Sequence, residues 1–371
     1  MESKRLYFID IIRAFAIIMM LQGHFISTLL NPEFRDLEII PYAVWNYFRG
    51  ITAPTFFTIS GLIFTYLLLK AKEKGEEHKR MRKGVIRGFF LMFVGYLIRI
   101  PFIQWLFGAF DTYFLVVDVL QCIGLSLICI IILYFLSGKR ILLFSFFTLA
   151  LGTFIFVTEP LYRGKNFENI PLIFSNYISK SNGSIFTIIP WFGYVSFGAF
   201  LATIFFKNIQ RKYFKPFAVG LFIFLGSLLI FQSSFILCEI SKVTNIKLFL
   251  DSASYNYLFT RLGNVFLYFA FFYAFENHLK FPLVLKIGQK TLSIYVIHFI
   301  IIYGSFTGIG LKVIGKTLTP WQAVFGALLF ITCVCFISFY YVKTNAFFYK
   351  NLRIFIEKWR GKSVPTTKKQ L

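Results

Sequence analysis

Seven ionisable side chains lie within long apolar stretches of this sequence, where a charged group needs a specific reason. They are Asp10, Arg13, His24, Arg99, Asp118, Arg261 and His298. A charge at the centre of a membrane helix costs about 2.5–3.5 kcal/mol on insertion scales, so such residues are commonly paired or functional. An imidazole can accept a proton near neutral pH, and a carboxylate can orient and stabilise that imidazole. The set therefore contains candidate bases and candidate partners for them.

The first apolar stretch carries the most informative pair. Arg13 and His24 are eleven residues apart, which is about three helical turns and about 16 Å along the axis, so they share one helix face. Asp10 lies one turn before Arg13 and could pair with it. A functional interpretation is favoured for two such residues on one face. The alternative is an arginine that reaches the membrane surface and a histidine that joins helices by a hydrogen bond.

Asp118 is expected at a depth similar to that of His24. It could fix the tautomer of the imidazole and stabilise its protonated form. An ion pair between Asp118 and Arg99 or Arg261 is an equally good interpretation. His298 lies in the middle of its stretch beside Tyr295, where a packing and hydrogen-bonding role is expected.

A basic segment, Lys70–Arg87, contains eight basic and three acidic residues. One interpretation is a cytoplasmic loop that sets topology and binds anionic lipid. The other is an electrostatic site for a polyanionic cytosolic molecule such as coenzyme A. In that case the candidate anion-binding residues are Arg13, Arg80, Arg82, Lys83 and Arg87.

The composition indicates what kind of protein holds these residues. Hydrophobic residues make up 57% of the chain and charged residues 15%, with a mean hydropathy of +0.71. Soluble chains average about 45–50% apolar and about 25% charged, so a soluble or disordered protein is excluded. The net charge of +23 does not indicate nucleic acid, because the basic residues lie in short segments between apolar runs. The expected partner is the lipid bilayer.

Ten apolar segments are long enough to cross a hydrocarbon core, which needs roughly 20 helical residues. They lie near 6–30, 51–70, 86–106, 113–136, 141–158, 185–206, 217–238, 257–276, 287–306 and 321–342. We therefore expect an all-α, polytopic integral membrane protein with about ten transmembrane helices.

Basic residues predict the orientation of these spans. Of the 39 lysines and arginines, 27 fall in segments on the N-terminal side of the membrane, 9 on the other side and 3 within spans. Both termini are therefore predicted to be cytoplasmic, with the loop 159–184 outside. We expect a membrane domain over 1–345, a basic cytoplasmic tail over 346–371 that is disordered from Gly361, and a location in a bacterial cytoplasmic membrane.

Several kinds of site are not expected. The five cysteines lie in or beside apolar segments and form no metal-ligand spacing, so no metal site is predicted. The sequence has no G-x-S-x-G, Walker A or H-E-x-x-H motif. No bound cofactor and no particular oligomeric state follow from it.

Two families share short motifs with this sequence. The segment Arg5–Ala14 followed by His24 resembles the first helix of acyltransferase-3 proteins, and 287–298 resembles their glycine–serine–tyrosine–histidine helix. The segments Trp45–Phe56, Asp118–Gly124 and Pro190–Tyr194 resemble the catalytic domain family of heparan-alpha-glucosaminide N-acetyltransferase. One departure is Tyr42, which stands where that enzyme has a histidine before Ala-x-Trp-Asn.

The resemblance implies an acyl-CoA-dependent acyltransferase. It would move an acyl group, expected to be acetyl, from cytosolic acyl-CoA to a hydroxyl or amine of an extracytoplasmic carbohydrate or glycolipid. By analogy His24 would be the general base, with Asp118 as its candidate partner. A transporter of a sugar, glycan or drug remains an alternative, because buried ionisable residues also suit proton-coupled transport. An inactive scaffold is a third.

Overall fold

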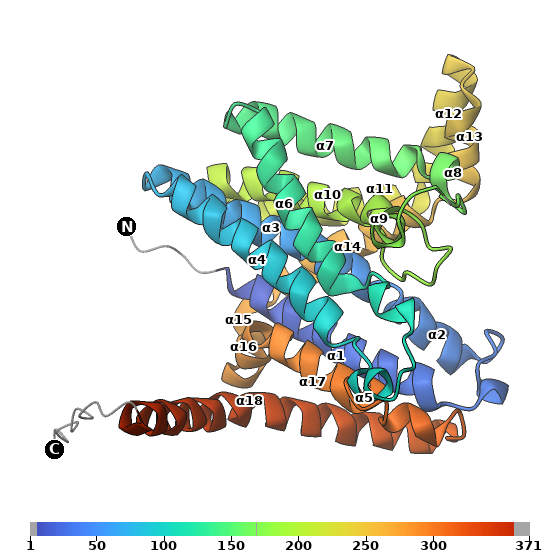
Figure 1. Cartoon of the computed structure of the whole chain (residues 1–371). Coiled ribbons are helices and arrows are strands. Elements are labelled where there is room, and N and C mark those ends of the chain that lie inside the picture. Colours follow the sequence, from blue (N-terminus) through green and yellow to red (C-terminus); the bar gives the residue numbers. More distant parts are fainter. Residues whose placement is uncertain (1–5, 168, 360–371) are drawn as a thin grey trace.

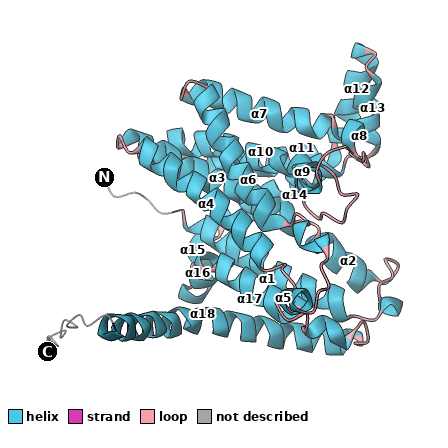
Figure 2. Cartoon of the chain, in the orientation of Figure 1, coloured by secondary structure: helices cyan, strands magenta, loops and turns pink. Residues whose placement is uncertain are grey.

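The structure is a computed structural model that describes residues 6–167 and 169–359. Within these residues the regular elements are all helices, and the only strand-like contact is a single bridge between Leu30 and Leu318. Figure 2 shows this all-helical architecture, which confirms the all-α part of the predicted fold class. The long helices are α1 (Tyr7–Leu29), α3 (Thr52–Glu73), α4 (Glu77–Leu97), α6 (Val119–Leu136), α7 (Ile141–Val157), α10 (Ile188–Asn208), α11 (Phe214–Phe231), α14 (Tyr257–Ala274), α17 (Thr291–Tyr303) and α18 (Pro320–Trp359).

Shorter helices connect them. These are α2 (Ile40–Arg49), α5 (Phe102–Leu106), α8 (Glu159–Tyr162), α9 (Leu172–Ile178), α12 (Ser233–Thr244), α13 (Lys247–Ser254), α15 (Glu276–Leu279) and α16 (Pro282–Gln289). Each of the ten predicted segments overlaps one of the long helices, and the sequence-based expectation did not include α2 or the α12–α13 hairpin.

Six helical stretches in the described part of the chain are long and apolar enough to cross a membrane. They are Tyr7–Leu29, Ile40–Glu73, Thr112–Leu136, Ile188–Asn208, Phe214–Phe231 and Pro320–Tyr340. A seventh is obtained if the bent pair α16–α17 counts as one span. Of the remaining helices, α7 has only 17 residues, α4 begins with a run of charges, and α14 carries Arg261 and Asn264. The protein is thus an integral membrane protein, and the full count of about ten spans stays a prediction.

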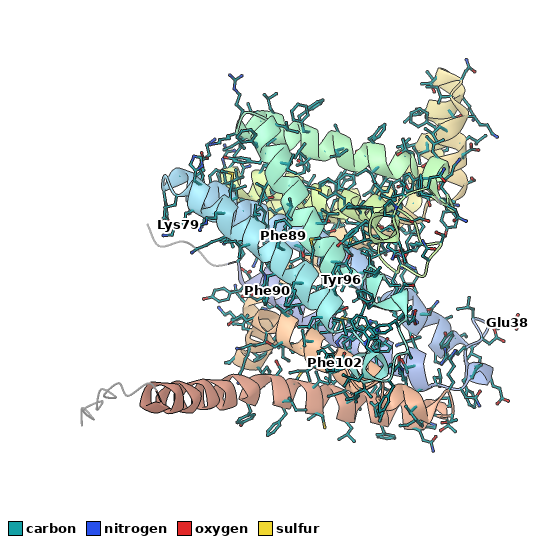
Figure 3. The ribbon with its side chains drawn as sticks, in the orientation of Figure 1. Glu38, Lys79, Phe89, Phe90, Tyr96 and Phe102 are labelled. Atoms are coloured by element: carbon teal, nitrogen blue, oxygen red, sulfur yellow. The ribbon has the colours of Figure 1, made fainter. Side chains whose placement is uncertain are left out.

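The bundle has two distinct ends (Figure 1). The start of α1, the α3–α4, α6–α7 and α10–α11 connections and the end of α18 lie together at one end. Helices α2, α5, α8, α9, α12 and α13 lie toward the other. Figure 3 marks these ends by Lys79 and Glu38, and we call them the Lys79 end and the Glu38 end.

Helix α1 is the central element. It contacts α3, α14, α16, α17 and α18, and its buried residues include both large apolar side chains and Asp10. At its start it packs directly on α16, because a side-chain carbon at Gly288 would overlap the backbone carbonyl of Asp10. The candidate residues of the first span are therefore held in the interior of the bundle.

Three helix pairs approach each other through glycines. Side-chain carbons at Gly61 and Gly198 would overlap the facing backbone of α10 and α3. The α4–α6 pair meets at Gly88 and Gly124, and the α11–α14 pair at Gly226 and Gly263. Small residues allow this close backbone approach in membranes, where helix association depends on van der Waals packing.

The predicted segment boundaries were wrong at two site helices. Helix α6 begins at Val119 and not near 113, because the Asp118 side chain caps its first turn and Gln121 returns a hydrogen bond to the Asp118 amide. Helix α4 begins at Glu77 and ends at Leu97, so its charged first turns precede the predicted segment 86–106. Lys139 donates to Glu77 there (Nζ–Oε1 2.7 Å), and this hydrogen bond lowers the pKa of the Glu77 carboxyl.

The ninth predicted segment is not one straight helix. Helices α16 and α17 meet at Lys290 with a bend of 72°. Helix α18 continues the last predicted segment to Trp359, so the backbone of the first part of the predicted tail is helical. The remainder of that tail, 360–371, lies outside the described residues.

Candidate active site

His24 lies on α1 in the half nearer the Glu38 end, with its side chain half-buried. Its Nδ1 is 2.7 Å from the hydroxyl oxygen of Tyr303, the last residue of α17. A hydrogen bond at one ring nitrogen fixes the imidazole orientation and leaves the other nitrogen, Nε2, available for a substrate. Tyr303 was not among the predicted site residues, and only its position one turn after Phe299 on the histidine-bearing helix could have indicated it.

Asp118 and Arg99 form an ion pair (Nη2–Oδ2 2.5 Å), with side chains 4% and 9% exposed for Arg99 and Asp118 respectively. The guanidinium also lies over the rings of Phe299 and Tyr113. Of the two arginines considered as ion-pair partners of Asp118, Arg99 and Arg261, the structure therefore selects Arg99. Asp118 does not hydrogen-bond to His24 directly, but both residues line the same two cavities.

His298 is fully buried on α17, and its ring contacts the ring of His24, with centroids 5.2 Å apart. The ring of Tyr295 packs against its other side. Neither ring nitrogen of His298 has a hydrogen-bond partner among the described residues. The structure thus brings the two predicted histidines together, and only His24 lines a cavity described here.

Arg13 lies on α1 closer to the Lys79 end. Its Nη2 donates to the Thr291 hydroxyl (2.6 Å), and its Nη1 is 3.9 Å from Asp10 Oδ1. Arg13 and Arg87 line one small cavity of about 130 Å³, which we call the inner cavity. Two guanidinium groups at one narrow cavity form a site suited to an anion.

A larger cavity of about 500 Å³, the central cavity, surrounds His24. Its wall also includes Arg49, whose guanidinium donates to Ser27 (2.7 Å), and Trp191 at the start of α10. The inner and central cavities are adjacent, because they share four lining residues. These are Met20, Phe56, Val119 and Tyr295.

Two further cavities adjoin the central cavity. The side cavity, about 440 Å³, lies between the Ile98–Asp118 segment and the end of α17 and shares His24, Asp118, Ile185 and Tyr303 with the central cavity. The outer cavity, about 540 Å³, is built mainly by the 159–191 segment and shares Lys180, Trp191 and Tyr257 with the central cavity. Burial lowers the pKa of the Lys180 ammonium in this loop.

Other predicted residues lie away from these cavities. Arg80 packs over the ring of Phe64, and Arg82 and Lys83 are exposed on the first turns of α4. Arg261 donates to the backbone carbonyl of Tyr47 (2.9 Å) and covers that residue's ring, which joins α14 to α2. The structure therefore gives Arg261 a role in helix packing.

The arrangement defines a polytopic membrane protein. A half-buried histidine, His24, lines two adjoining cavities in its interior. The family model described as heparan-alpha-glucosaminide N-acetyltransferase, catalytic, matches residues 5–235. The chain belongs to this family, which suggests a membrane acetyltransferase. No curated protein matches the chain. The match includes Arg13, His24 and Asp118, whereas the bent helix with His298 and Tyr303 follows it.

Proposed function

We propose that the protein transfers an acyl group, expected to be acetyl, from cytosolic acyl-CoA to a hydroxyl or amine of an extracytoplasmic carbohydrate. The observation that carries this proposal is the adjacency of the inner and central cavities, which share four lining residues. The Arg13–Arg87 site and His24 therefore line neighbouring cavities. An anionic donor bound near Arg13 would direct its acyl end toward His24.

In this mechanism His24 is the general base. The acceptor oxygen or nitrogen forms a bond to the acyl carbon, while Nε2 of His24 takes the acceptor proton. The carbon–sulfur bond of the thioester then breaks, and the proton passes to the departing thiolate. Tyr303 holds the ring by its hydrogen bond at Nδ1.

The orientation that we propose makes the Lys79 end cytoplasmic, in a bacterial cytoplasmic membrane. The basic residues of the Lys70–Arg87 segment support it, since such residues concentrate on cytoplasmic sides. The same orientation gives a cytosolic donor direct access to the inner cavity. The acceptor then reaches His24 from the Glu38 end.

The direct test is release of free coenzyme A by purified protein in vesicles, measured with a thiol reagent. Acetyl-CoA is supplied with a panel of amino sugars, neutral sugars and lipid-linked sugars. Release that depends on an acceptor is expected. If every acceptor leaves coenzyme A release at background while a labelled sugar crosses the vesicle membrane, the protein is a transporter and the proposal is wrong.

The inner cavity predicts which arginines bind the donor. Replacing Arg13 or Arg87 by alanine should raise the KM for acetyl-CoA by about 10–100-fold, because each removes a charge-assisted hydrogen bond to phosphate. Titration of KM against salt concentration should show a weaker dependence in both variants. Arg82→Ala on the exposed side of α4 is the matched control. An equal effect of all three variants would show that the basic residues attract the donor by their overall charge and that the inner cavity is not a specific donor site.

Cysteine labelling can test the orientation. Glu38→Cys and Lys79→Cys place thiols at opposite ends of the bundle (Figure 3). On intact cells a membrane-impermeant maleimide should label Glu38→Cys, whereas Lys79→Cys should react only after permeabilisation. The unsubstituted protein measures the background from its own cysteines. The reverse pattern would invert the donor and acceptor sides.

A further inference from the structure

We propose that the side cavity binds the carbohydrate headgroup of a lipid-linked acceptor, whose hydrocarbon chain lies against the apolar surface of α5. This inference rests on the proposed acyltransferase function and assigns its two substrates to different cavities. The acceptor would therefore approach His24 from within the outer leaflet of the membrane.

The way in which the cavities adjoin one another indicates a different binding site for each of the two substrates. The inner cavity shares residues with the central cavity and none with the side cavity. A donor held at Arg13 therefore lies next to the central cavity and not next to the side cavity. His24 and Tyr303 stand in the wall common to the central and side cavities. A base in that wall can touch an acceptor on one side and an acyl group on the other, as a two-substrate reaction requires.

The interior of the side cavity is polar enough for a sugar. Besides His24 and the Arg99–Asp118 pair, it is lined by Gln104, Asp111 and Lys312. The side chains of Gln104 and Lys312 make no hydrogen bond or ion pair to the part of the protein that the structure describes, so both can bind hydroxyl groups. Its volume of about 440 Å³ lies within the range of ligand cavities, about 300–1,000 Å³.

Next to the lining residues of the side cavity, the chain carries strongly exposed apolar side chains. Leu106, Phe107 and Phe110, which follow the lining residue Gln104, are 70%, 85% and 78% exposed, and Ile309, which follows the lining residue Gly308, is 76% exposed. We call these four side chains the rim of the side cavity. The segment that carries Gln104 is held in place by two backbone hydrogen bonds, Ile103 N to Phe306 O (2.9 Å) and Phe306 N to Ile100 O (3.2 Å).

A polar cavity with an apolar rim matches an amphipathic ligand. In a membrane such side chains contact lipid, so a lipid-linked acceptor can keep its alkyl or isoprenoid chain against them while its headgroup enters the polar cavity. The outer cavity differs in this respect, since its wall carries Arg163, Lys165 and Lys180 in an extramembrane loop. The competing possibility is a soluble acceptor that binds in the outer cavity. If the experiments below show that, the proposal is wrong.

Photo-crosslinking tests binding without turnover. The probe is octadecyl glucosaminide with a diazirine at the second chain carbon, in phosphatidylethanolamine–phosphatidylglycerol vesicles that contain the full-length protein and no donor. Peptides from 98–114 or 304–314 should be labelled, and excess unmodified octadecyl glucosaminide should suppress this labelling while octadecanol should not. Labelling confined to 158–191, or suppressed equally by octadecanol, would overturn the proposal.

Kinetics provide the second test. Phe107→Ser combined with Leu106→Ser should reduce the preference for octadecyl over butyl glucosaminide, measured as the ratio of kcat/KM values, by about tenfold. Phe231→Ser combined with Phe235→Ser removes two exposed phenyl groups elsewhere near the Glu38 end and should leave this ratio unchanged. An unchanged ratio in both variants would exclude the rim as the chain site. Absence of coenzyme A release by the unsubstituted protein with both probes and with the whole acceptor panel would instead contradict the proposed function, whatever the crosslinking shows.

Discussion

Replacing His24 by alanine should lower the turnover number for acyl transfer by about 10²–10⁴-fold, the usual contribution of a positioned base. The KM for acetyl-CoA should change little, because His24 is not part of the inner cavity. The alanine leaves the fold intact, since the histidine is half-buried and makes one side-chain hydrogen bond, to Tyr303. Coenzyme A release by purified variants in vesicles measures both constants.

Two neighbouring substitutions show whether the effect belongs to His24. Tyr303→Phe keeps the ring and removes the hydroxyl at Nδ1, so it should lower turnover by about tenfold with little effect on the KM for the donor. His298→Phe keeps a ring against His24 and should retain more activity than His24→Ala. Near-normal turnover of His24→Ala, together with an inactive but folded His298→Phe, would show that His298 is the base.

The largest effect on stability is expected at the contact between α3 and α10. Gly198→Ala should destabilise the protein by about 1–3 kcal/mol, the typical cost of forcing extra atoms into a packed interior, and Gly198→Leu by more. The added carbon would overlap the backbone carbonyl of Thr58, which cannot move aside as a flexible side chain can. Thermal unfolding of the purified protein in detergent, followed by tryptophan fluorescence, measures the change.

Gly220 in α11 is the matched control. It is also helical, but a side-chain carbon there would meet no atom within 4 Å. Gly220→Ala should therefore keep the unfolding temperature or raise it slightly, because alanine favours the helix over glycine. If Gly198→Ala were as stable as Gly220→Ala, the close contact of α3 with α10 would be wrong.

Much of the helical framework could be predicted from the sequence, because the length of an apolar segment is enough to indicate a membrane helix. The predicted segment 6–30 corresponds to α1 at Tyr7–Leu29, and 141–158 to α7 at Ile141–Val157. The same reasoning misplaced the start of α6, since hydropathy takes no account of a capping carboxylate at Asp118. It also missed the bend at Lys290, which hydropathy does not register.

The candidate site could be predicted only in part. Spacing on one helix put Arg13 and His24 on a common face, and the structure has both at adjoining cavities of the bundle. Partners on other helices could not be assigned, because sequence spacing says nothing about which helices are neighbours. Tyr303 and Thr291 were missed for this reason, and the choice between Arg99 and Arg261 as the partner of Asp118 required the fold.

The glycine contact between α3 and α10 has a mechanical consequence for the central cavity. Helix α3 contributes Phe56 and Thr52 to its wall, and α10 contributes Trp191. Because the two backbones already touch at Gly61 and Gly198, the helices cannot come closer to narrow this cavity. Under the proposed function, the side-chain size at positions such as Phe56 would then limit how small an acyl group still fits the cavity closely. A change of acyl specificity could arise by substitution there without any redesign of the bundle.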